Sequence, residues 1–377
     1  MDYKFIESDK ELETVCESLL EETIIGVDLE ADSMHCFNEK ICLIQIATAN
    51  QAYLIDPFKI KDLTCFTQVL ESANVKKIFH GADFDVRSLD RDYGVRMENL
   101  FDTEIACRFL GIKERGLGAL IKKYFDVDLD KRFQKEDWSA RPLKKDMIEY
   151  SVGDVTYLIR LHDIIHKRLS DCARLSWADE EFEIQSKVRY ENNHTAPLFL
   201  KFKGAGKMDN RALAALENLL QVRLDIARKK DKPLFMILSS QTVADLAAKR
   251  PETVEQMVKS RLLSPKQAQM YGQACVDAIV SAVNLSHGQL PSYPKTRRSK
   301  PDLGVKERTE QLKKMREKLS MSLGIEPGFL LNNTMISVIA VQNPTTLPAL
   351  SQIENIRQWQ VTAIGQDILN NLGYCRS

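Results

Sequence analysis

The chain has 377 residues, of which 44% are hydrophobic and 28% charged, and its formal net charge at pH 7 is zero. This composition is typical of a folded protein of two or three domains, and it argues against a disordered or a membrane protein. The zero average hides an asymmetry, because residues 201–377 hold 26 Lys+Arg against 15 Asp+Glu and residues 1–200 hold 27 against 38. An acidic front and a basic back favour an acid-rich reaction centre joined to a segment that binds polyanions, although ordinary surface charge gives the same count.

The N-terminal residues and the cysteines bear on where the protein works. The polar, acidic stretch MDYKFIESDK is unlike a signal peptide, and no apolar run approaches the 18 or so residues that a membrane span needs. The eight cysteines are scattered and form no C-x-x-C pair, which argues against a zinc site and a disulfide framework. We therefore expect a cytoplasmic protein that has no membrane partner.

In chain order, the hydrophobic pattern predicts strands first and then mainly helices. The strands are expected at 23–30, 41–48, 52–56 and 76–79, and short turns make the first three antiparallel neighbours. The helical patterns fall at 62–72, 83–91, 103–110, 116–124 and 144–169, and no convincing strand follows residue 175. We predict an α/β fold with a mixed sheet flanked by helices, followed by all-α bundles.

The first predicted strand ends in a pair of acids. In IIGVDLEAD (24–32), Asp28 and Glu30 are two positions apart, so their side chains point to the same face of the strand. Two adjacent carboxylates repel each other and are costly to remove from water. A divalent cation would neutralise them, and oxygen ligands suit Mg²⁺ or Mn²⁺.

Further acids follow at two later places. Residues 80–85, HGADFD, follow a strand and open a helix; we interpret Asp83 as the N-cap of that helix and Asp85 as the functional acid. In YSVGD, Tyr150 and Asp154 are four residues apart on one helix face. For this pentapeptide alone a surface pair is the better explanation, but the three acidic motifs together are far more specific.

The C-terminal part contains a faint internal repeat on either side of a Pro/Gly/Ser/Lys/Arg-rich stretch at 285–304. VADLAAKRP (243–251) resembles ISVIAVQNP (336–344), and at an offset of 93 the identical residues are Ala247 and Ala340, Pro251 and Pro344, Gln267 and Gln360, and Gly272 and Gly365. Chance is the alternative, but we predict two similar helical modules joined by a linker.

The order of these motifs resembles the DEDD 3′→5′ exonuclease superfamily, in the subgroup that carries a tyrosine. The closest resemblance is to the ribonuclease D family and to related exosome-associated exoribonucleases. It rests on VDLE (27–30), LIQIA (43–47), FHGADFDVRSL (79–89), LFDTEIACRFLG (100–111), DWSARPL (137–143) and YSVGDVTYL (150–158). The repeat resembles two copies of the HRDC module, which ribonuclease D and RecQ-type helicases carry. The resemblance implies an RNase H-like fold for the first part and covers essentially the whole chain.

The resemblance also implies a catalytic set and its metals. Asp28 and Glu30 stand where the family has its first acidic pair, and we assign Asp28 as the ligand that bridges two divalent cations, Mg²⁺ or Mn²⁺. Glu30 and Asp154 would complete the metal site on the side of the attacking water, and Asp85 would bind the second metal. Tyr150 would orient that water. The implied products are nucleoside 5′-monophosphates released from an RNA 3′ end.

The expected organisation and partners follow from the same reasoning. We expect an exonuclease domain at 1–175, a first HRDC domain at 205–285, a linker at 286–304 and a second HRDC-like domain at 305–377, in a monomer that acts on RNA 3′ ends such as those of tRNA precursors. Trp138 and Arg141 could contact a base and a phosphate, and Lys229 and Lys230 could meet phosphates, although packing and helix termination explain these residues as well.

Two other functions stay open from the sequence. One is a DNA 3′→5′ exonuclease, because no residue here can be shown to contact the 2′-OH that distinguishes RNA from DNA. The other is a non-catalytic nucleic-acid-binding adaptor that uses its helical modules. The intact set of five motif residues argues against the adaptor.

Overall fold

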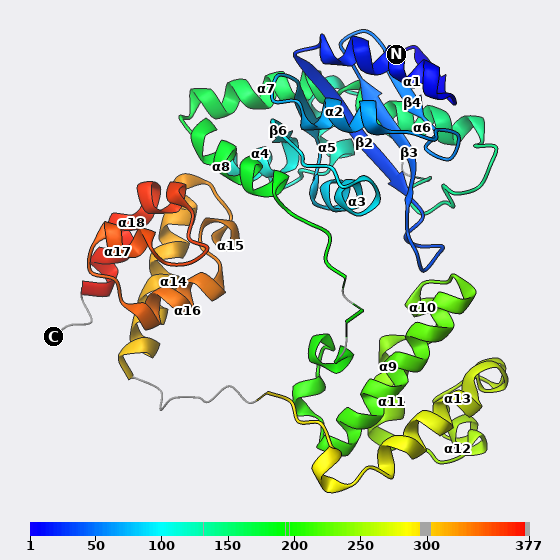
Figure 1. Ribbon diagram of the computed structural model, residues 1–377. Coiled ribbons are helices and arrows are strands. Elements are labelled where there is room, and N and C mark those ends of the chain that lie inside the picture. The colour runs from blue at the N-terminus through cyan, green and yellow to red at the C-terminus, as the bar shows by residue number, and fades with distance from the viewer. Residues whose placement is uncertain (131, 193, 196, 295–302, 374–377) are drawn as a thin grey trace. The chain divides into compact units, whose positions relative to one another are not determined.

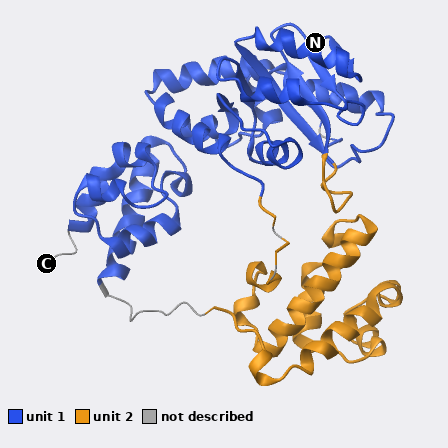
Figure 2. Cartoon of the chain, viewed as in Figure 1, with its two compact units in different colours: residues 1–31, 41–190, 298–377 blue, residues 32–40, 191–297 orange. Residues whose placement is uncertain are grey.

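The computed structural model describes residues 1–377 except 131, 193, 196, 295–302 and 374–377 (Figure 1). The chain forms two compact units (Figure 2). The first unit comprises residues 1–31, 41–190 and 298–377, and the second comprises residues 32–40 and 191–297. Much of the predicted linker at 286–304 therefore lies outside the described residues.

A six-stranded mixed sheet lies at the centre of the first unit, with the strand order β1-β4-β3-β2-β5-β6. β2 pairs antiparallel with β3, and β3 with β4, which confirms the prediction from the short turns. The pairs β1–β4, β2–β5 and β5–β6 are parallel. The strands are β1 (Tyr3–Ile6), β2 (Ile24–Ala31), β3 (Ile41–Ala47), β4 (Ala52–Ile55), β5 (Lys76–Phe79) and β6 (Leu100–Asp102). The predicted mixed sheet flanked by helices is confirmed.

Two of these strands, β1 and β6, were not predicted from the sequence. β1 is four residues long at the edge of the sheet, and only its last residue, Ile6, is buried. β6 has three residues, which is too short for a period-2 pattern to be recognised. Both are fixed by parallel pairing with a strand distant in the sequence, which local patterns do not report.

The helices that accompany the sheet match the predicted positions with two differences. They are α1 (Asp9–Leu20), α2 (Thr64–Glu71), α3 (Asp83–Tyr93), α4 (Thr103–Phe109), α5 (Leu117–Phe125), α6 (Lys145–Thr156), α7 (Leu158–Asp171) and α8 (Leu175–Ser186). Helices α1 and α8 were not predicted, and the single helix expected at 144–169 is instead α6 and α7, which meet at Tyr157. A Cβ atom at Gly26 of β2 would lie 3.0 Å from the Leu158 Cβ, so this glycine lets the start of α7 approach the sheet.

The predicted repeat is present as two sets of helices with the same order. The second unit contains α9 (Asn210–Lys230), α10 (Leu234–Ile237), α11 (Ser240–Lys249), α12 (Val254–Lys259) and α13 (Pro265–Val283), with 3₁₀ turns at Leu198–Lys201, Ala205–Lys207 and His287–Gln289. The first unit contains α14 (Leu303–Leu323), α15 (Pro327–Leu330), α16 (Asn333–Gln342), α17 (Leu347–Ser351) and α18 (Gln358–Gly373). We call these sets the first and the second helical module; each helix of the second starts 93 residues after its counterpart in the first.

The matching glycines of the repeat mark a close helix contact in both modules. A Cβ at Gly272 would lie 2.9 Å from Cγ1 of Val254, and one at Gly365 would lie 2.7 Å from Cδ2 of Leu347. Val254 and Leu347 are themselves 93 residues apart. Each module therefore needs glycine at this position so that its last helix can pack on the short helix before it.

The second helical module shares the hydrophobic core of the first unit. The Trp359 ring centroid lies 5.1 Å from that of Phe109 and 5.6 Å from that of Trp177. An ion pair of 2.9 Å joins Arg115 Nη1 to Glu326 Oε1. The unit thus joins the N-terminal sheet to the C-terminal module, an arrangement that a linear order of separate domains does not suggest.

Candidate active site

Three carboxylates meet beside the central strand β2. Asp28 and Glu30 lie on β2 and Asp154 lies on α6, and each offers one oxygen within 4.8 Å of the others. Val27 and Leu29 alternate with the two acids along β2 and are buried, so Asp28 and Glu30 lie together on the opposite face of the strand. The three acids line a cavity of about 440 Å³. The structure therefore brings together acids from two of the three predicted motifs.

Tyr150 lies one helical turn before Asp154 and lines the same cavity. Its ring packs 6.0 Å from the Trp138 ring and 5.8 Å from the Phe133 ring, centroid to centroid. Burial, followed by the negative charges of Asp154 and Glu30, raises the pKa of the Tyr150 hydroxyl far above its ordinary value. The phenol therefore stays protonated and can donate a hydrogen bond.

Asp85 and Asp83 have different environments, although two residues separate them. Asp85 is buried in the first turn of α3, and its negative charge contributes to the raised pKa of both Asp28 and Glu30. It lies outside the group of three ligand oxygens. The prediction that Asp83 is the helix N-cap is wrong: the N-cap is Ala82, and the Asp83 carboxylate accepts hydrogen bonds from Arg87 at 2.9 and 3.1 Å.

The electrostatics of the four acids show a strong preference for a positive charge. Burial and then the neighbouring Asp154, Asp85 and Glu30 raise the pKa of Asp28 well above its ordinary value. Burial and like charges raise the pKa of Glu30 to about 9 and that of Asp85 to about 7. Burial raises the pKa of Asp154 to about 7, partly offset by a hydrogen bond from Tyr150. Without a cation, clustered buried carboxylates retain protons.

The donor set fits a divalent cation. In the described part of the chain, none of the four carboxylates forms a salt bridge with a lysine or an arginine. Buried carboxylates are otherwise paired or metal-bound, and their hard oxygen atoms are the ligands that Mg²⁺ and Mn²⁺ prefer. Asp28, Glu30 and Asp154 can hold one ion.

Asp102, which the sequence did not single out, positions the turn that leads to Asp85. Its carboxylate accepts hydrogen bonds from the backbone N–H groups of Gly81 and Ala82, at 2.9 and 2.8 Å. Gly81 has a φ of +81°, a conformation that favours glycine. Asp102 also caps α4 through Glu104 N, so one buried carboxylate fixes two helix starts.

His80 lines the cavity and has a defined hydrogen-bond pattern. The Thr103 hydroxyl donates to the Phe79 carbonyl at 3.0 Å, so His80 Nδ1, 2.9 Å from that hydroxyl, is the donor to it. Burial lowers the pKa of His80, opposed by the negative charges of Asp102 and Glu104 and by a hydrogen bond with the Arg115 backbone.

Gln45 is a second residue that sequence reasoning missed. It pairs directly with Asp28 across β2 and β3, so both side chains lie on one face of the sheet. It is fully buried, and neither amide atom has a hydrogen-bond partner in the described part of the protein. A lone polar residue within the apolar run ICLIQIA was the signal available in the sequence.

The structure does not support Trp138 and Arg141 as contacts to nucleic acid. Trp138 is 1% exposed, and its indole N–H donates to the Phe133 carbonyl. Arg141 donates to both carboxylate oxygens of buried Asp56, at 2.6 and 2.9 Å, and to the Cys42 carbonyl. The Trp138 ring is covered, and the Arg141 guanidinium is held by the protein, so both residues stabilise the loop before α6.

Lys229 and Lys230 lie at the end of α9 in the second unit, where sequence reasoning placed them. Both are exposed, and Lys230 Nζ lies 4.8 Å from the centroid of the Tyr271 ring. Their positive charges are favourable at a helix C-terminus. Contact between either lysine and a phosphate stays a prediction.

Comparison with known proteins agrees with the fold. Residues 3–170 match a family model described as 3′-5′ exonuclease, and residues 212–279 and 305–372 each match the HRDC domain. Among solved structures, ribonuclease D of Escherichia coli superposes with a TM-score of 0.77 at 23% identity over 99% of each chain, which shows the shared fold. The catalytic core of RRP6 from Trypanosoma brucei has a TM-score of 0.66 at 28% identity, covering 74% of this chain and 79% of that one.

Two curated relatives are similar over most of their length. Ribonuclease D of Desulfotalea psychrophila is 28% identical over 337 residues, 89% of either chain. Ribonuclease D of Zymomonas mobilis is 31% identical over 287 residues, which cover 74% of this chain and 73% of that protein. With the acidic site, the exonuclease match and the two HRDC matches in the family's order, the chain belongs to the ribonuclease D family.

Proposed function

We propose that this chain, a 3′→5′ exoribonuclease, trims the 3′ ends of structured RNA such as tRNA precursors and releases nucleoside 5′-monophosphates. The observation that carries the proposal is the cavity in which Asp28, Glu30, Asp154 and Tyr150 converge. The similar Escherichia coli enzyme is described as an exoribonuclease involved in structured RNA processing, which supports this class of substrate. In the described residues, no helix is long and apolar enough to span a membrane.

The enzyme depends on divalent metal, and the finer proposal is two ions, Mg²⁺ or Mn²⁺. Asp28 would contact both ions, Glu30 and Asp154 would hold the one nearer the attacking water, and Asp85 would hold the other. When bound, such ions supply a water of lowered pKa and neutralise charge on the phosphate and the leaving oxygen. The raised pKa values of the four acids support this proposal, because ion binding removes the repulsion that causes them.

Tyr150 would orient the attacking water by a hydrogen bond. Since its pKa is raised, the hydroxyl remains a donor and does not act as a general base at neutral pH. Its ring is held between Phe133 and Trp138, which limits the positions of the hydroxyl. His80 lines the same cavity and would lie beside the bound substrate.

The proposed organisation assigns cutting and holding to different parts of a cytoplasmic monomer. Residues 1–175 carry the reacting groups, and residues 205–285 form a module that holds the RNA through cationic side chains such as Lys229 and Lys230. Residues 286–304 are the proposed linker, and residues 305–377 the second HRDC-like domain. Contacts to phosphate release counterions, so RNA binding should weaken as salt rises.

A single assay tests the proposal. Purified protein with Mg²⁺ is incubated with a 5′-labelled tRNA precursor, a short single-stranded RNA and a DNA of the same sequence. We expect stepwise shortening of both RNAs from the 3′ end, 5′-monophosphate products, and no comparable loss of DNA. The matched control is Asp28→Asn, which should bind RNA in EDTA like the wild type and cut it at a rate lower by about 10² or more, since several kcal/mol of transition-state stabilisation depend on the metal site.

The outcomes are separable. Endonucleolytic fragments, or an Asp28→Asn rate within tenfold of the wild type, would contradict the assigned site. Faster shortening of DNA than of RNA would assign the protein to the DNA exonucleases. Cutting of the short RNA without any trimming of the tRNA precursor would keep the exoribonuclease and reject the structured substrate.

A further inference from the structure

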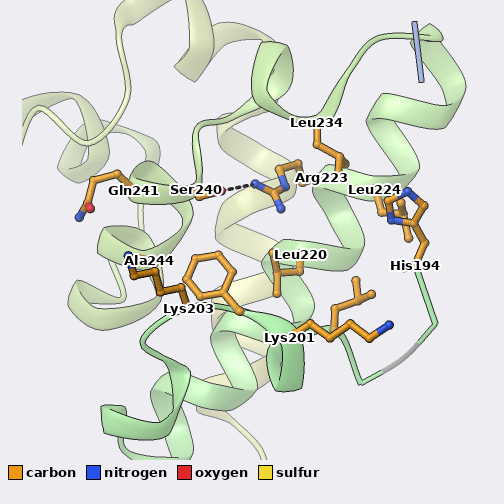
Figure 3. A pocket seen from close by; sticks show the side chains of 12 residues that line it. His194, Lys201, Lys203, Leu220, Arg223, Leu224, Leu234, Ser240, Gln241 and Ala244 are labelled. Atoms are coloured by element: carbon orange, nitrogen blue, oxygen red, sulfur yellow. Dashed lines mark hydrogen bonds between the residues drawn. The ribbon is translucent and has the colours of Figure 1, made fainter. Parts of the chain in front are cut away.

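The first helical module contains a cavity of about 450 Å³, remote in sequence from the catalytic acids (Figure 3). Its size lies within the range of small-molecule sites, about 300–1,000 Å³. Its wall includes apolar side chains, among them Phe202 and Leu224, and the cationic side chains of Lys201, Lys203 and Arg223. The cavity thus offers the two kinds of group that a nucleotide needs, apolar side chains for its sugar or base and cations for its phosphate.

Arg223, on α9, is the deepest charged residue of this cavity. Its side chain is 92% buried, and its Nε has no hydrogen-bond partner in the described part of the protein. Its Nη1 reaches the Leu238 carbonyl and the Ser240 hydroxyl only at 3.4 and 3.5 Å. Burial lowers the pKa of the guanidinium, but arginine remains charged at neutral pH. A buried cation with such weak partners is costly unless an anion reaches it.

The second helical module provides an internal comparison. Arg316 is 93 residues after Arg223, and its Nη1 donates to the equivalent carbonyl of Leu331 at 3.0 Å and to Asn333 Oδ1 at 2.9 Å. Its Nη2 also meets the carboxylate of Glu317 at 3.1 Å. The shared contacts show that this arginine has a structural role in both modules. The Nε of Arg316, like that of Arg223, has no hydrogen-bond partner in the described part of the protein, so the two modules differ at the Nη atoms. Those of Arg223 have only long contacts and meet no acid among the described residues.

The surroundings of Arg223 are positive. Among the described residues that line the cavity, none is acidic. The pKa of His194 at its rim is lowered by burial and then by the positive charges of Arg228, Arg223 and Lys201. Ser240 and Gln241 open α11, a helix of ten residues, so the positive end of its dipole lies at the wall. Arg223, the lysines of the lining and the N-terminal end of α11 therefore all contribute positive potential to this cavity.

We propose that this cavity binds the phosphate group of a nucleotide, with Arg223 and Lys203 on the phosphate and the sugar or base against the apolar wall. A guanidinium and a phosphate match in charge and geometry, and a bound phosphate gives Arg223 the acceptor it lacks. The nucleotide is either a free nucleoside monophosphate or a unit of an RNA strand, since both offer the same chemistry. The site is separate from the metal-binding acids and does not depend on hydrolysis.

The test is a binding titration of the full chain in EDTA, where no RNA is cut. The probes are adenosine 5′-monophosphate, adenosine, inorganic phosphate and a short oligoribonucleotide. We expect the monophosphate to bind and adenosine not to bind. Arg223→Gln should weaken binding about tenfold to 100-fold, the effect of losing a charged hydrogen bond. Lys203→Gln, at an exposed position, should weaken it about two- to fivefold.

The matched control is Lys249→Gln, which removes one exposed charge from α11 outside the cavity. If Arg223→Gln fails to fold, Lys203→Gln still tests the proposal, because an exposed lysine contributes little to packing. Equal affinity for the oligonucleotide and the monophosphate assigns the site to free nucleotides, whereas much tighter binding of the oligonucleotide, lost in the same variants, assigns it to RNA. The proposal is overturned if the Lys203→Gln variant and the control bind every phosphate probe as the wild type does.

Discussion

At the scale of single residues, the site consists of polar and acidic side chains that the fold removes from water, although burial of such groups costs free energy. Asp28 is held by strand alternation between Val27 and Leu29, and Asp154 and Tyr150 are held by one helical turn. Gln45 and Asp102 support this arrangement from neighbouring strands. The environment of each acid, more than its residue type, therefore determines whether it lies at the candidate site.

Asp83 and Asp85 test that statement directly. Asp85→Asn should lower kcat by about 10² or more, because it removes a proposed ligand of the metal ion that stabilises the charge of the transition state. Asp83→Asn should stay within about threefold of the wild type, because it removes only an exposed ion pair to Arg87. Single-turnover hydrolysis of a short RNA at saturating Mg²⁺ measures both. The reverse order of the two rates would mean that Asp83 is the functional acid.

Tyr150→Phe separates orientation of water from metal binding. The ring contacts to Phe133 and Trp138 remain, so the fold should be unchanged. We expect the single-turnover rate to fall by about two to three orders of magnitude, as for other positioned proton-handling groups. Mn²⁺ affinity, measured by calorimetry, should change little. A wild-type rate in this variant would leave the hydroxyl with a structural role only.

The sequence predicted that Asp28, Glu30 and Asp154 come together because each belongs to a motif with a local signature. A D-x-E pair at a strand end and Y-x-x-x-D on a helix can be recognised without knowledge of the rest of the chain. Gln45 and Asp102 escaped because their importance arises from pairing across the sheet and from hydrogen bonds to residues about 20 positions away. The nucleic-acid prediction for Trp138 failed for a related reason: burial depends on tertiary packing.

At the scale of secondary-structure elements, long periodic segments were predictable and short ones were not. β2, β3 and the helix α9 carry clear apolar patterns, whereas β6 has three residues and takes its conformation from its partner β5. The expected helix at 144–169 keeps one pattern across α6 and α7, and the break at Tyr157 follows from packing on the sheet. The local apolar pattern predicted whether a segment is a helix or a strand, whereas tertiary contacts determine where that helix or strand ends.

Strand β5 contains a buried lysine that makes stability depend on pH. Lys77 is fully buried, and its Nζ donates to the Ser72 carbonyl at 2.6 Å. Burial lowers the pKa of Lys77 from 10.5 to about 8. Between these two values the unfolded chain binds more protons than the folded one, so this lysine makes the free energy of unfolding rise as the pH increases from about 8 to 10.5.

The comparison with Lys77→Met isolates this effect from other titrating groups. Denaturation can be followed by tryptophan fluorescence, because all three tryptophans, Trp138, Trp177 and Trp359, belong to the first unit. The difference in unfolding free energy between wild type and variant should shift in favour of the wild type as the pH rises. A constant difference from pH 8 to 10.5 would show that Lys77 keeps its proton in the fold.

At the scale of the whole molecule, the two modules have the same fold and different surfaces. Trp359 of the second module packs against Phe109 and Trp177, whereas the equivalent position in the first module is the exposed Lys266. Arg357 of the second module pairs with Glu181 of α8 at 3.0 Å. Duplication therefore gave one copy that shares the core of the N-terminal sheet and one that keeps a charged surface at the same place.

Trp359→Ala and Lys266→Ala make a matched pair for this difference. The first should lower the unfolding free energy of the first unit by about 3–5 kcal/mol, the usual cost of truncating a buried aromatic side chain. The second should change it by no more than about 0.5 kcal/mol, as for exposed positions. Urea denaturation followed by the fluorescence of Trp138 and Trp177 measures both. Equal, small effects would mean that the second module adds nothing to the stability of the sheet.

The sharing of one core by the two ends of the chain sets an order of events during synthesis. Phe109 and Trp177 leave the ribosome long before their partners Phe329 and Trp359. At about 5–20 residues per second, residues 191–377 take roughly 10 to 40 s to be made. Throughout that interval Phe109 and Trp177 lack these partners, so their rings stay partly uncovered. We therefore expect a chain that ends before the second helical module to be less stable than one that includes it.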